Sequence, residues 1–317
     1  MPLLQGLAKR VLAGDGRRRA IAPEVVGMMR DNFAHALSYL EQAKPWLTEA
    51  ENLRHRALFL EFSDKIARDL DATVSDVIHE VGQKVPAWLE QLIRHWHEQR
   101  CTVLTLNYDT LIETIAATLS FNGERLTAQQ LYPPLLTDAG LRSAGRGTGQ
   151  PSESFRLLKL HGSTNWYYSG RRQAYGEPIF FVPPLPATDG GPDARRQHEF
   201  RMKAVADKYP FLIPPVYDKT ALLTHETIRA LWFEGGDALR RARRVICMGY
   251  SLPESDLTMK HFLRTSCAAR AEILIVDPSV EALRNFERLF AGTRVRCRHH
   301  RRGKATIARF VADRLHA

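Results

Sequence analysis

The stretch Leu158–Trp166 reads LKLHGSTNW and separates an apolar strand pattern from a polar segment. The residues Phe155–Leu160 form an apolar run typical of a β-strand that ends at His161. Gly162 has no Cβ, so the chain can turn sharply there or admit a bulky group beside it. The pattern predicts that His161 stands at the strand end, either as a hydrogen-bonded turn residue or as part of a cleft wall.

The composition is ordinary for a soluble globular protein, with 44% hydrophobic and 25% charged residues in a chain of 317. No apolar run approaches the roughly 20 residues of a membrane helix, and the first residues lack a secretory pattern. We therefore expect a cytoplasmic protein with no membrane partner. The cysteines are scattered without a C-x-x-C pair, which predicts neither a paired-cysteine zinc site nor a disulfide framework. They are Cys101, Cys247, Cys267 and Cys297.

The formal net charge of +10 raises the expectation of an anionic partner. The densest basic run is Arg294–Lys304, RVRCRHHRRGK. Two interpretations stay open for it: a nucleic-acid patch, or a solvated edge strand followed by its turn.

The first 100 residues carry mainly helical periodicity. The spacing of apolar residues predicts helices over residues 24–43, 49–70 and 75–99. Pro86 is expected to kink or split the third of these helices, because proline cannot supply the backbone hydrogen bond.

From residue 101 onward, short apolar runs alternate with helical patterns. The predicted strands or extended segments are 101–106, 155–160, 177–182, 211–216, 244–248, 272–276 and 294–298. The predicted helices are 111–119, 195–207, 227–242, 253–268, 279–290 and 305–315. This alternation predicts an α/β fold, a Rossmann-like doubly wound parallel sheet with a helical N-terminal region. We expect one domain over 1–317, mainly helical in 1–100 and α/β in 101–317.

Polar side chains follow four of these strands, and parallel sheets bind ligands at the carboxyl ends of their strands. These residues are Asn107, Tyr108, Asp109, His161, Gly249, Ser251 and Asp277. Local interpretations remain open for several of them. Thr110 and Glu113 fit a capping box that would make Asp109 a helix-start residue. Ser251 fits an N-cap, and Asp277 fits a cap before Pro278.

Three motifs in order resemble the SIR2-like family: Thr105–Asp109 (TLNYD), Leu160–Trp166 (LHGSTNW) and Gly249–Asp256 (GYSLPESD). The chain is more similar to the bacterial SIR2-like branch, which includes NAD-cleaving antiviral-defence proteins, than to protein-deacylase sirtuins. The cysteine pairs of the sirtuin zinc module are absent between the second and third motifs, which disfavours NAD-dependent protein deacylation and any metal.

The resemblance implies a Rossmann-type domain that takes NAD as its substrate and cleaves the nicotinamide–ribose bond. It places His161, Asn107 and Asp109 at the catalytic centre, with His161 as the base, Asn107 holding the water or the ribose, and Asp109 supporting it. The residues that it implies for NAD binding are Thr105, Tyr108, Gly162, Gly249, Tyr250, Ser251 and Asp277. NAD or ADP-ribose, a second copy of the chain or an activating protein are the partners that it implies.

One departure from the family pattern keeps a second hypothesis open. The opening strand with its glycine-rich turn is not found, and the nearest candidate, Leu12–Gly16, follows no convincing strand. Either the chain as given starts downstream of that motif, or the motif is lost. In the second case we expect a non-catalytic module that binds nucleotides or nucleic acid.

Overall fold

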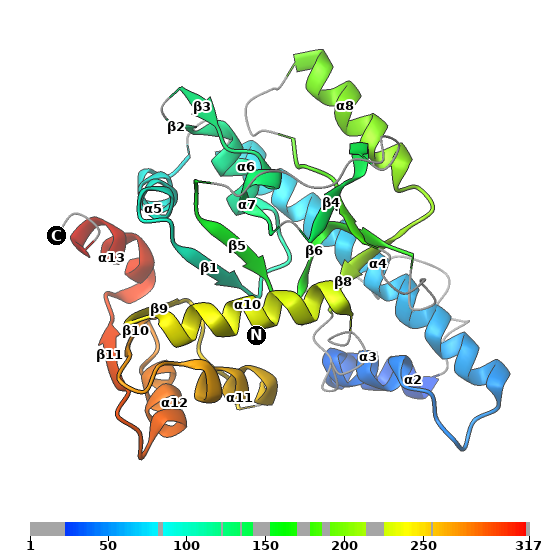
Figure 1. Cartoon of the computed structure of the whole chain (residues 1–317). Helices are drawn as coiled ribbons and strands as arrows, with labels where there is room; N and C mark the ends of the chain where they lie inside the picture. The colour runs from blue at the N-terminus through cyan, green and yellow to red at the C-terminus, as the bar shows by residue number, and fades with distance from the viewer. Residues whose placement is uncertain are drawn as a thin grey trace. The chain divides into compact units, whose positions relative to one another are not determined.

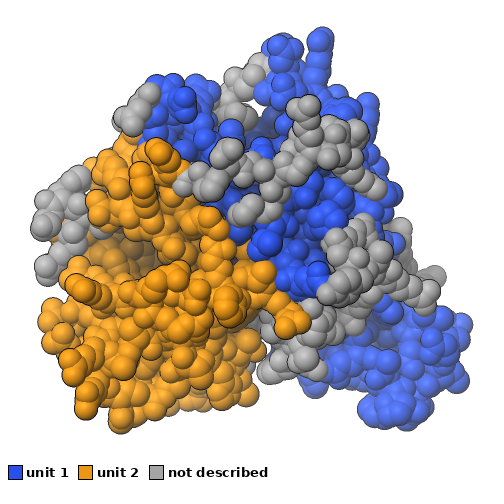
Figure 2. All heavy atoms as spheres, viewed as in Figure 1, with its two compact units in different colours: residues 1–83, 105–150, 159–228 blue, residues 84–104, 151–158, 229–317 orange. Residues whose placement is uncertain are grey.

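The computed structural model divides into two compact units, which are shown in Figure 2 and described separately. Unit 1 consists of residues 1–83, 105–150 and 159–228, and unit 2 of residues 84–104, 151–158 and 229–317. The structure describes residues 23–81, 85–121, 123–133, 135–141, 153–169, 178–185, 191–213, 225–254 and 256–314. The glycine-rich candidate Leu12–Gly16 lies outside these residues.

The described part of unit 1 begins with three helices: α2 (Pro23–Asp31), α3 (Phe33–Glu41) and α4 (Glu49–Val81). The single helix predicted for residues 24–43 is interrupted at Asn32, whose backbone is extended with φ −152° and ψ 99°. The Asn32 side chain accepts a hydrogen bond from the backbone N of His35, so it caps a new helix. Pro86 follows the end of α4 and precedes α5 (Ala87–Glu98), as the predicted split requires.

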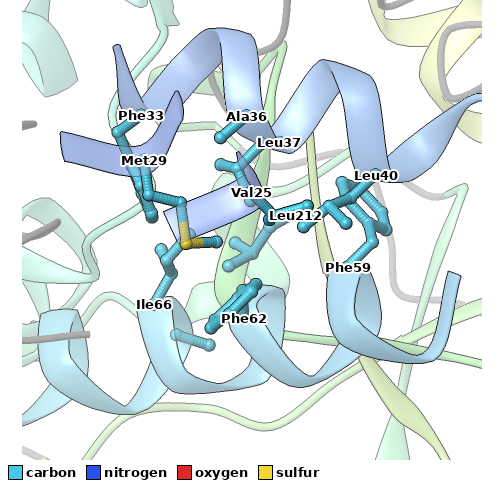
Figure 3. Close-up of a cluster of buried hydrophobic side chains, with 11 residues drawn as sticks. Val25, Met29, Phe33, Ala36, Leu37, Leu40, Phe59, Phe62, Ile66 and Leu212 are labelled. Atoms are coloured by element: carbon cyan, nitrogen blue, oxygen red, sulfur yellow. The ribbon is translucent and has the colours of Figure 1, made fainter. Parts of the chain in front are cut away.

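Helices α2, α3 and α4 are held together by a cluster of buried apolar side chains, shown in Figure 3. Its members are Val25, Met29, Phe33, Ala36, Leu37, Leu40, Phe59, Phe62, Ile66, Ala67 and Leu212. Phe59, Phe62 and Ile66 recur at three- and four-residue intervals and so share one face of α4. Because Leu212 comes from a strand, the cluster fixes the helices against a sheet. Full burial of each large side chain contributes about 1.5–3 kcal/mol.

The sheet of unit 1 has four strands in the order β4 (Leu136–Asp138), β7 (Ile179–Phe181), β6 (Gly162–Tyr168) and β8 (Tyr209–Leu212). Strand β6 pairs antiparallel with both β7 and β8, whereas β4 and β7 are parallel. The chain turns at Leu160 and His161, as the strand-end interpretation predicted, and the polar residues that follow His161 belong to strand β6. Gly162, with φ +82°, is the first residue of β6 and pairs with Leu212 of β8.

Shorter elements complete unit 1 around this sheet (Figure 1). They are α6 (Leu111–Thr118), the hairpin of β2 (Ser120–Phe121) and β3 (Glu124–Arg125), α7 (Ala128–Leu131), the 3₁₀ turn η2 (Ala139–Leu141) and α8 (Gly191–Ala204). The predicted helices 111–119 and 195–207 correspond to α6 and α8, the second beginning four residues earlier than expected.

Strands β1 (Thr102–Thr105) and β5 (Arg156–Lys159) pair as a two-stranded sheet. Their last residues, Thr105 and Lys159, are counted with unit 1 and the others with unit 2. The backbone hydrogen bonds from Arg156 N to Cys101 O and from Leu160 N to Thr105 O advance in the same direction along both strands. The pair is therefore parallel, as the sequence predicted.

Unit 2 also contains an all-parallel sheet in the order β11 (Arg296–His300), β10 (Glu272–Val276) and β9 (Arg244–Met248). The strands predicted for 244–248 and 272–276 are confirmed without a shift, and β11 begins two residues later than expected. Among the described strands β11 lies at the sheet edge, as one of the two interpretations of the basic run predicted, and this position does not test the nucleic-acid interpretation. The described strands form several small sheets, parallel and mixed, in an α/β fold.

Helices connect and flank these strands (Figure 1): α10 (Glu226–Arg241), α11 (Leu257–Ser266), α12 (Val280–Phe290) and α13 (Thr306–Arg314), with the short 3₁₀ turn η3 (Gly303–Ala305) before the last. Helix α11 starts four residues later than predicted, because the Asp256 side chain caps it by accepting a hydrogen bond from Met259 N. Among the described residues, no helix has the length and apolar character needed to cross a membrane.

Tyr168 at the end of β6 gives a pH-dependent prediction. Its ring is 7% exposed and packs edge-on against Phe211 at 4.8 Å, and burial raises the pKa of its phenol to about 12. The unfolded chain releases this proton near pH 10, so rising pH favours unfolding between pH 10 and 12. We expect Tyr168 to lower the free energy of unfolding by about 1.4 kcal/mol per pH unit in that window. Urea titrations of the wild type and Tyr168→Phe should diverge only above pH 10, and parallel curves would contradict the prediction.

Candidate functional site

The segments that follow β1 and β5 run side by side within unit 1. Leu160 N donates to Thr105 O at 3.0 Å, and Thr164 N donates to Tyr108 O at 3.0 Å. The Ser163 hydroxyl donates to the same Tyr108 carbonyl at 3.1 Å. The chain after β1 therefore lies along the chain that contains His161, as expected for the carboxyl ends of neighbouring parallel strands.

His161 lies at the corner between β5 and β6 with 6% of its surface exposed. Its ring stacks on Tyr108, with centroids 6.3 Å apart and an interplanar angle of 29°. Ile213 holds both residues, because its backbone N donates to His161 O at 2.8 Å and its carbonyl accepts from the Tyr108 hydroxyl at 2.6 Å. These contacts fix the imidazole on a rigid backbone corner.

Gly162 is required at this corner for a packing reason. Its φ is +82°, and a Cβ built there would stand 2.2 Å from the carbonyl oxygen of Phe211. The space that the sequence suggested for a ligand is thus occupied by the backbone of β8. Contact between Gly162 and NAD stays a prediction.

Asn107 and Asp109 differ in their surroundings. Asn107 is exposed, and its backbone N donates to the Thr105 hydroxyl at 3.1 Å, which turns the chain at the end of β1. Asp109 is half-buried, and its Oδ1 accepts from Leu111 N at 3.1 Å, so it helps to start α6. The capping box suggested for Thr110 and Glu113 was wrong, because Thr110 makes no side-chain cap bond and Glu113 is 1% exposed.

Glu113 belongs instead to a buried polar network beneath this corner. Its Oε1 lies 3.0 Å from the Lys159 ammonium and accepts from the Tyr132 hydroxyl at 2.5 Å. Lys159 also donates to the backbone carbonyl of Asp109, and Tyr132 lies 3.3 Å from Asn165 Oδ1. Burial, and next the Glu113 carboxylate, raise the pKa of Tyr132 well above its usual range.

Sequence reasoning missed the roles of Glu113, Lys159 and Tyr132. The available signal was Lys159, a charged residue inside an apolar strand that was expected to be buried. A buried lysine requires a carboxylate or several acceptors, so its presence indicates a partner on a neighbouring element.

The second group of predicted residues follows β9 and β10 in unit 2. Gly249 has φ +65° and its N donates to Val276 O at 3.0 Å, so it lies beside the end of β10. Asp277, 7% exposed, accepts from Ser279 N through Oδ1 at 2.7 Å. Gly249 and Asp277 are therefore neighbours at the carboxyl ends of β9 and β10. Ser279, not Asp277, caps α12.

The loop after β9 is shaped by Tyr250, Ser251 and Leu252. The Tyr250 hydroxyl donates to Asp256 Oδ2 at 2.9 Å, and burial together with the Asp256 charge raises the pKa of Tyr250. Ser251 is exposed, and its carbonyl accepts from Asn285 Nδ2 at 2.9 Å. Because Asp256 caps α11, the N-cap interpretation of Ser251 was wrong. Leu252 is buried with φ +51°, a left-handed conformation that a leucine rarely adopts.

The predicted residues thus converge as two groups, each within its own unit. Thr105, Asn107, Tyr108, Asp109, His161 and Gly162 gather at the end of β1 and β5. Gly249, Tyr250, Ser251 and Asp277 gather at the end of β9 and β10. In the part of the chain that the structure describes, no cluster of three or more His, Cys, Asp or Glu side chains could hold a metal ion.

No family model matches the chain, and no curated protein matches it.

Proposed function

We propose that the chain is a SIR2-like enzyme with a Rossmann-like doubly wound sheet, and that it cleaves the nicotinamide–ribose bond of NAD. The observation that carries the proposal is the backbone ladder that brings Asn107–Asp109 alongside His161. It joins two of the three motifs that resemble the SIR2-like family, although they lie about 50 residues apart in the sequence. A role in bacterial antiviral defence belongs to this proposal.

The proposed reaction is a hydrolysis. The C1′–N bond to nicotinamide breaks, the pyridine nitrogen keeps the electron pair, and nicotinamide leaves as a neutral molecule. A water oxygen forms the new bond to C1′, and its proton passes to the His161 imidazole, since histidine is the side chain that most often acts as a general base. The exposed Asn107 amide positions the water or the ribose hydroxyls, and Asp109 supports the Asn107 segment through its contact at the start of α6.

In this proposal the second group of residues binds the phosphate, ribose and adenine portions of NAD. Gly249 allows close approach of a phosphate, Ser251 offers an exposed hydroxyl, and Asp277 lies where a carboxylate can accept from ribose hydroxyls or an adenine amine. The proposal also includes Thr105, Tyr108 and Gly162 of unit 1 and Tyr250 of unit 2 as NAD-binding residues.

Substitution of the two central side chains tests the proposal. We expect His161→Ala and Asn107→Ala each to lower the rate of nicotinamide release from NAD by about 10²–10⁴-fold, the range for loss of a positioned acid–base or polar group. His35→Ala, an exposed histidine of α3, is the matched control and should retain the wild-type rate. Nicotinamide is quantified by chromatography with the full chain. Equal rates in all variants would contradict the proposal.

A non-catalytic nucleotide-binding module is the second candidate. It is favoured by the turn-forming bonds of Asp109 and Asp277, which occupy one oxygen of each carboxylate with backbone contacts. Calorimetry with NAD and with ADP-ribose separates the candidates, because this module binds both and releases no nicotinamide.

A further inference from the structure

Helices of unit 2 cover the carboxyl half of one face of the β9–β10–β11 sheet. Side chains at alternate positions share a face, and on this face Met248, Leu274 and Val276 pack with residues of α5 and α13. His300 continues the cover by packing edge-on against Phe310 at 5.3 Å. The covered half is the carboxyl half of the sheet.

On the amino half of the same face, the described arginines Arg244, Arg296 and Arg298 are exposed. The strand register puts Arg244, Glu272 and Arg296 in one row across the sheet, and Arg298 two residues further along β11. Arg243 and Arg270 stand at the entrances to β9 and β10, and an open hollow of about 600 Å³ is lined by Arg243, Arg244, Arg270, Glu272 and Arg296. We call these residues, with Arg298, the arginine hollow.

The charges in the arginine hollow are far from balanced. Five guanidinium groups surround one carboxylate, which gives a net charge of +4. Arg244 and Arg298 are each 64% exposed, and their Nε atoms lie 3.7 and 3.8 Å from Glu272. Within the described residues, Arg243, Arg270 and Arg296 are exposed and have no carboxylate partner. Such crowding of like charges raises the free energy of the isolated chain, and an anion relieves it.

We propose that the arginine hollow binds the phosphodiester backbone of a nucleic acid. Guanidinium groups present planar pairs of donors that match phosphate oxygens. Arg296 and Arg298 are about 7 Å apart along β11, and Arg244 and Arg296 are about 10 Å apart across the sheet. The arginine side chains can therefore contact several phosphates at once. A second copy of the chain is not the expected partner, because it would bring the same net positive charge to this surface. A membrane surface fits less well, since Ile246 is the one exposed large apolar side chain in the described part of these strands.

This assignment is independent of the proposed NAD chemistry. Gly249 and Asp277 follow the carboxyl ends of β9 and β10, whereas the arginine hollow lies at the amino ends, about 16 Å away along five-residue strands. It also divides the basic run Arg294–Lys304, because Arg296 and Arg298 belong to the hollow and Arg301–Lys304 follow the opposite end of β11.

Fluorescence anisotropy with a labelled 20-base-pair DNA duplex and a labelled 20-nucleotide RNA tests the proposal on the full chain. Four phosphate contacts predict a slope of about −3.6 in log K against log salt for the duplex, or about a 100-fold loss of affinity between 50 and 200 mM salt. Arg243→Gln/Arg270→Gln should bring the slope to about −1.8 and weaken binding at least about tenfold at the lower salt. Comparing the affinity for the RNA with the affinity for the DNA duplex shows which of the two nucleic acids is preferred.

Arg264→Gln/Arg309→Gln removes the same charge from exposed positions of α11 and α13 and should leave affinity and slope unchanged. Equal losses in both double variants, or no binding at 50 mM salt, would overturn the proposal. Preferred binding to anionic lipid vesicles that is lost only in Arg243→Gln/Arg270→Gln would overturn it in favour of a membrane surface.

Discussion

Replacing Lys159 by methionine should lower the free energy of unfolding by about 3–5 kcal/mol, the cost of leaving a buried charge without its partner. Lys159 and Glu113 are each 1% exposed, and their charged atoms lie 3.0 Å apart. Among the described residues, Lys159 and Tyr132 are the side chains that bind the Glu113 carboxylate, and the variant leaves the Tyr132 hydroxyl alone. It also removes the ammonium that holds the Asp109 carbonyl.

Urea denaturation followed by circular dichroism measures this loss. Lys203→Met, at an exposed position of α8, is the control and should change the stability by less than about 0.5 kcal/mol. Lys159→Met/Glu113→Leu should recover much of the loss, since apolar replacement of both partners removes the stranded charge. A loss below about 1 kcal/mol in Lys159→Met would show that the network does not hold the corner below His161.

Gly162→Ala should be the second severe change, with a loss of at least about 3 kcal/mol. The added Cβ meets the Phe211 carbonyl oxygen at 2.2 Å and its ring at 3.0 Å, so β8 must move away from β6. The positive φ of +82° adds about 1 kcal/mol of conformational cost.

Gly123→Ala separates these two causes. Gly123 has φ +89° with nothing within 4 Å of the built Cβ, so only the conformational cost of about 1 kcal/mol applies. Equal melting temperatures for Gly162→Ala and Gly123→Ala would contradict the close packing of β6 on β8.

The strands of unit 2 could be predicted from the sequence because their signal is local. Glu272–Val276 and Arg244–Met248 are apolar runs bounded by turn residues, and both strands were placed without a shift. The break between α2 and α3 also had a local signal in Asn32, whose side chain caps the second helix. The prediction of one helix over residues 24–43 instead followed the apolar periodicity, which continues on both sides of Asn32.

The corner at His161 could be predicted only in part. The apolar runs 101–106 and 155–160 predicted β1 and β5 as strands of a parallel sheet. The rule that ligands bind at the carboxyl ends of such strands then grouped Asn107–Asp109 with His161. The direction taken after Gly162 depends on the Phe211 carbonyl, which lies about 50 residues further along the chain, and no local pattern encodes it. The role of Glu113 likewise depends on Lys159, on a different element.

The most direct test of the proposed NAD cleavage is a product analysis of NAD incubated with the purified full chain. The proposed hydrolysis predicts that NAD disappears while nicotinamide and ADP-ribose accumulate in equal amounts, and that His161→Ala abolishes both products. Unchanged NAD in the presence of folded wild-type chain that binds NAD by calorimetry would contradict the enzyme assignment and leave a nucleotide-binding module.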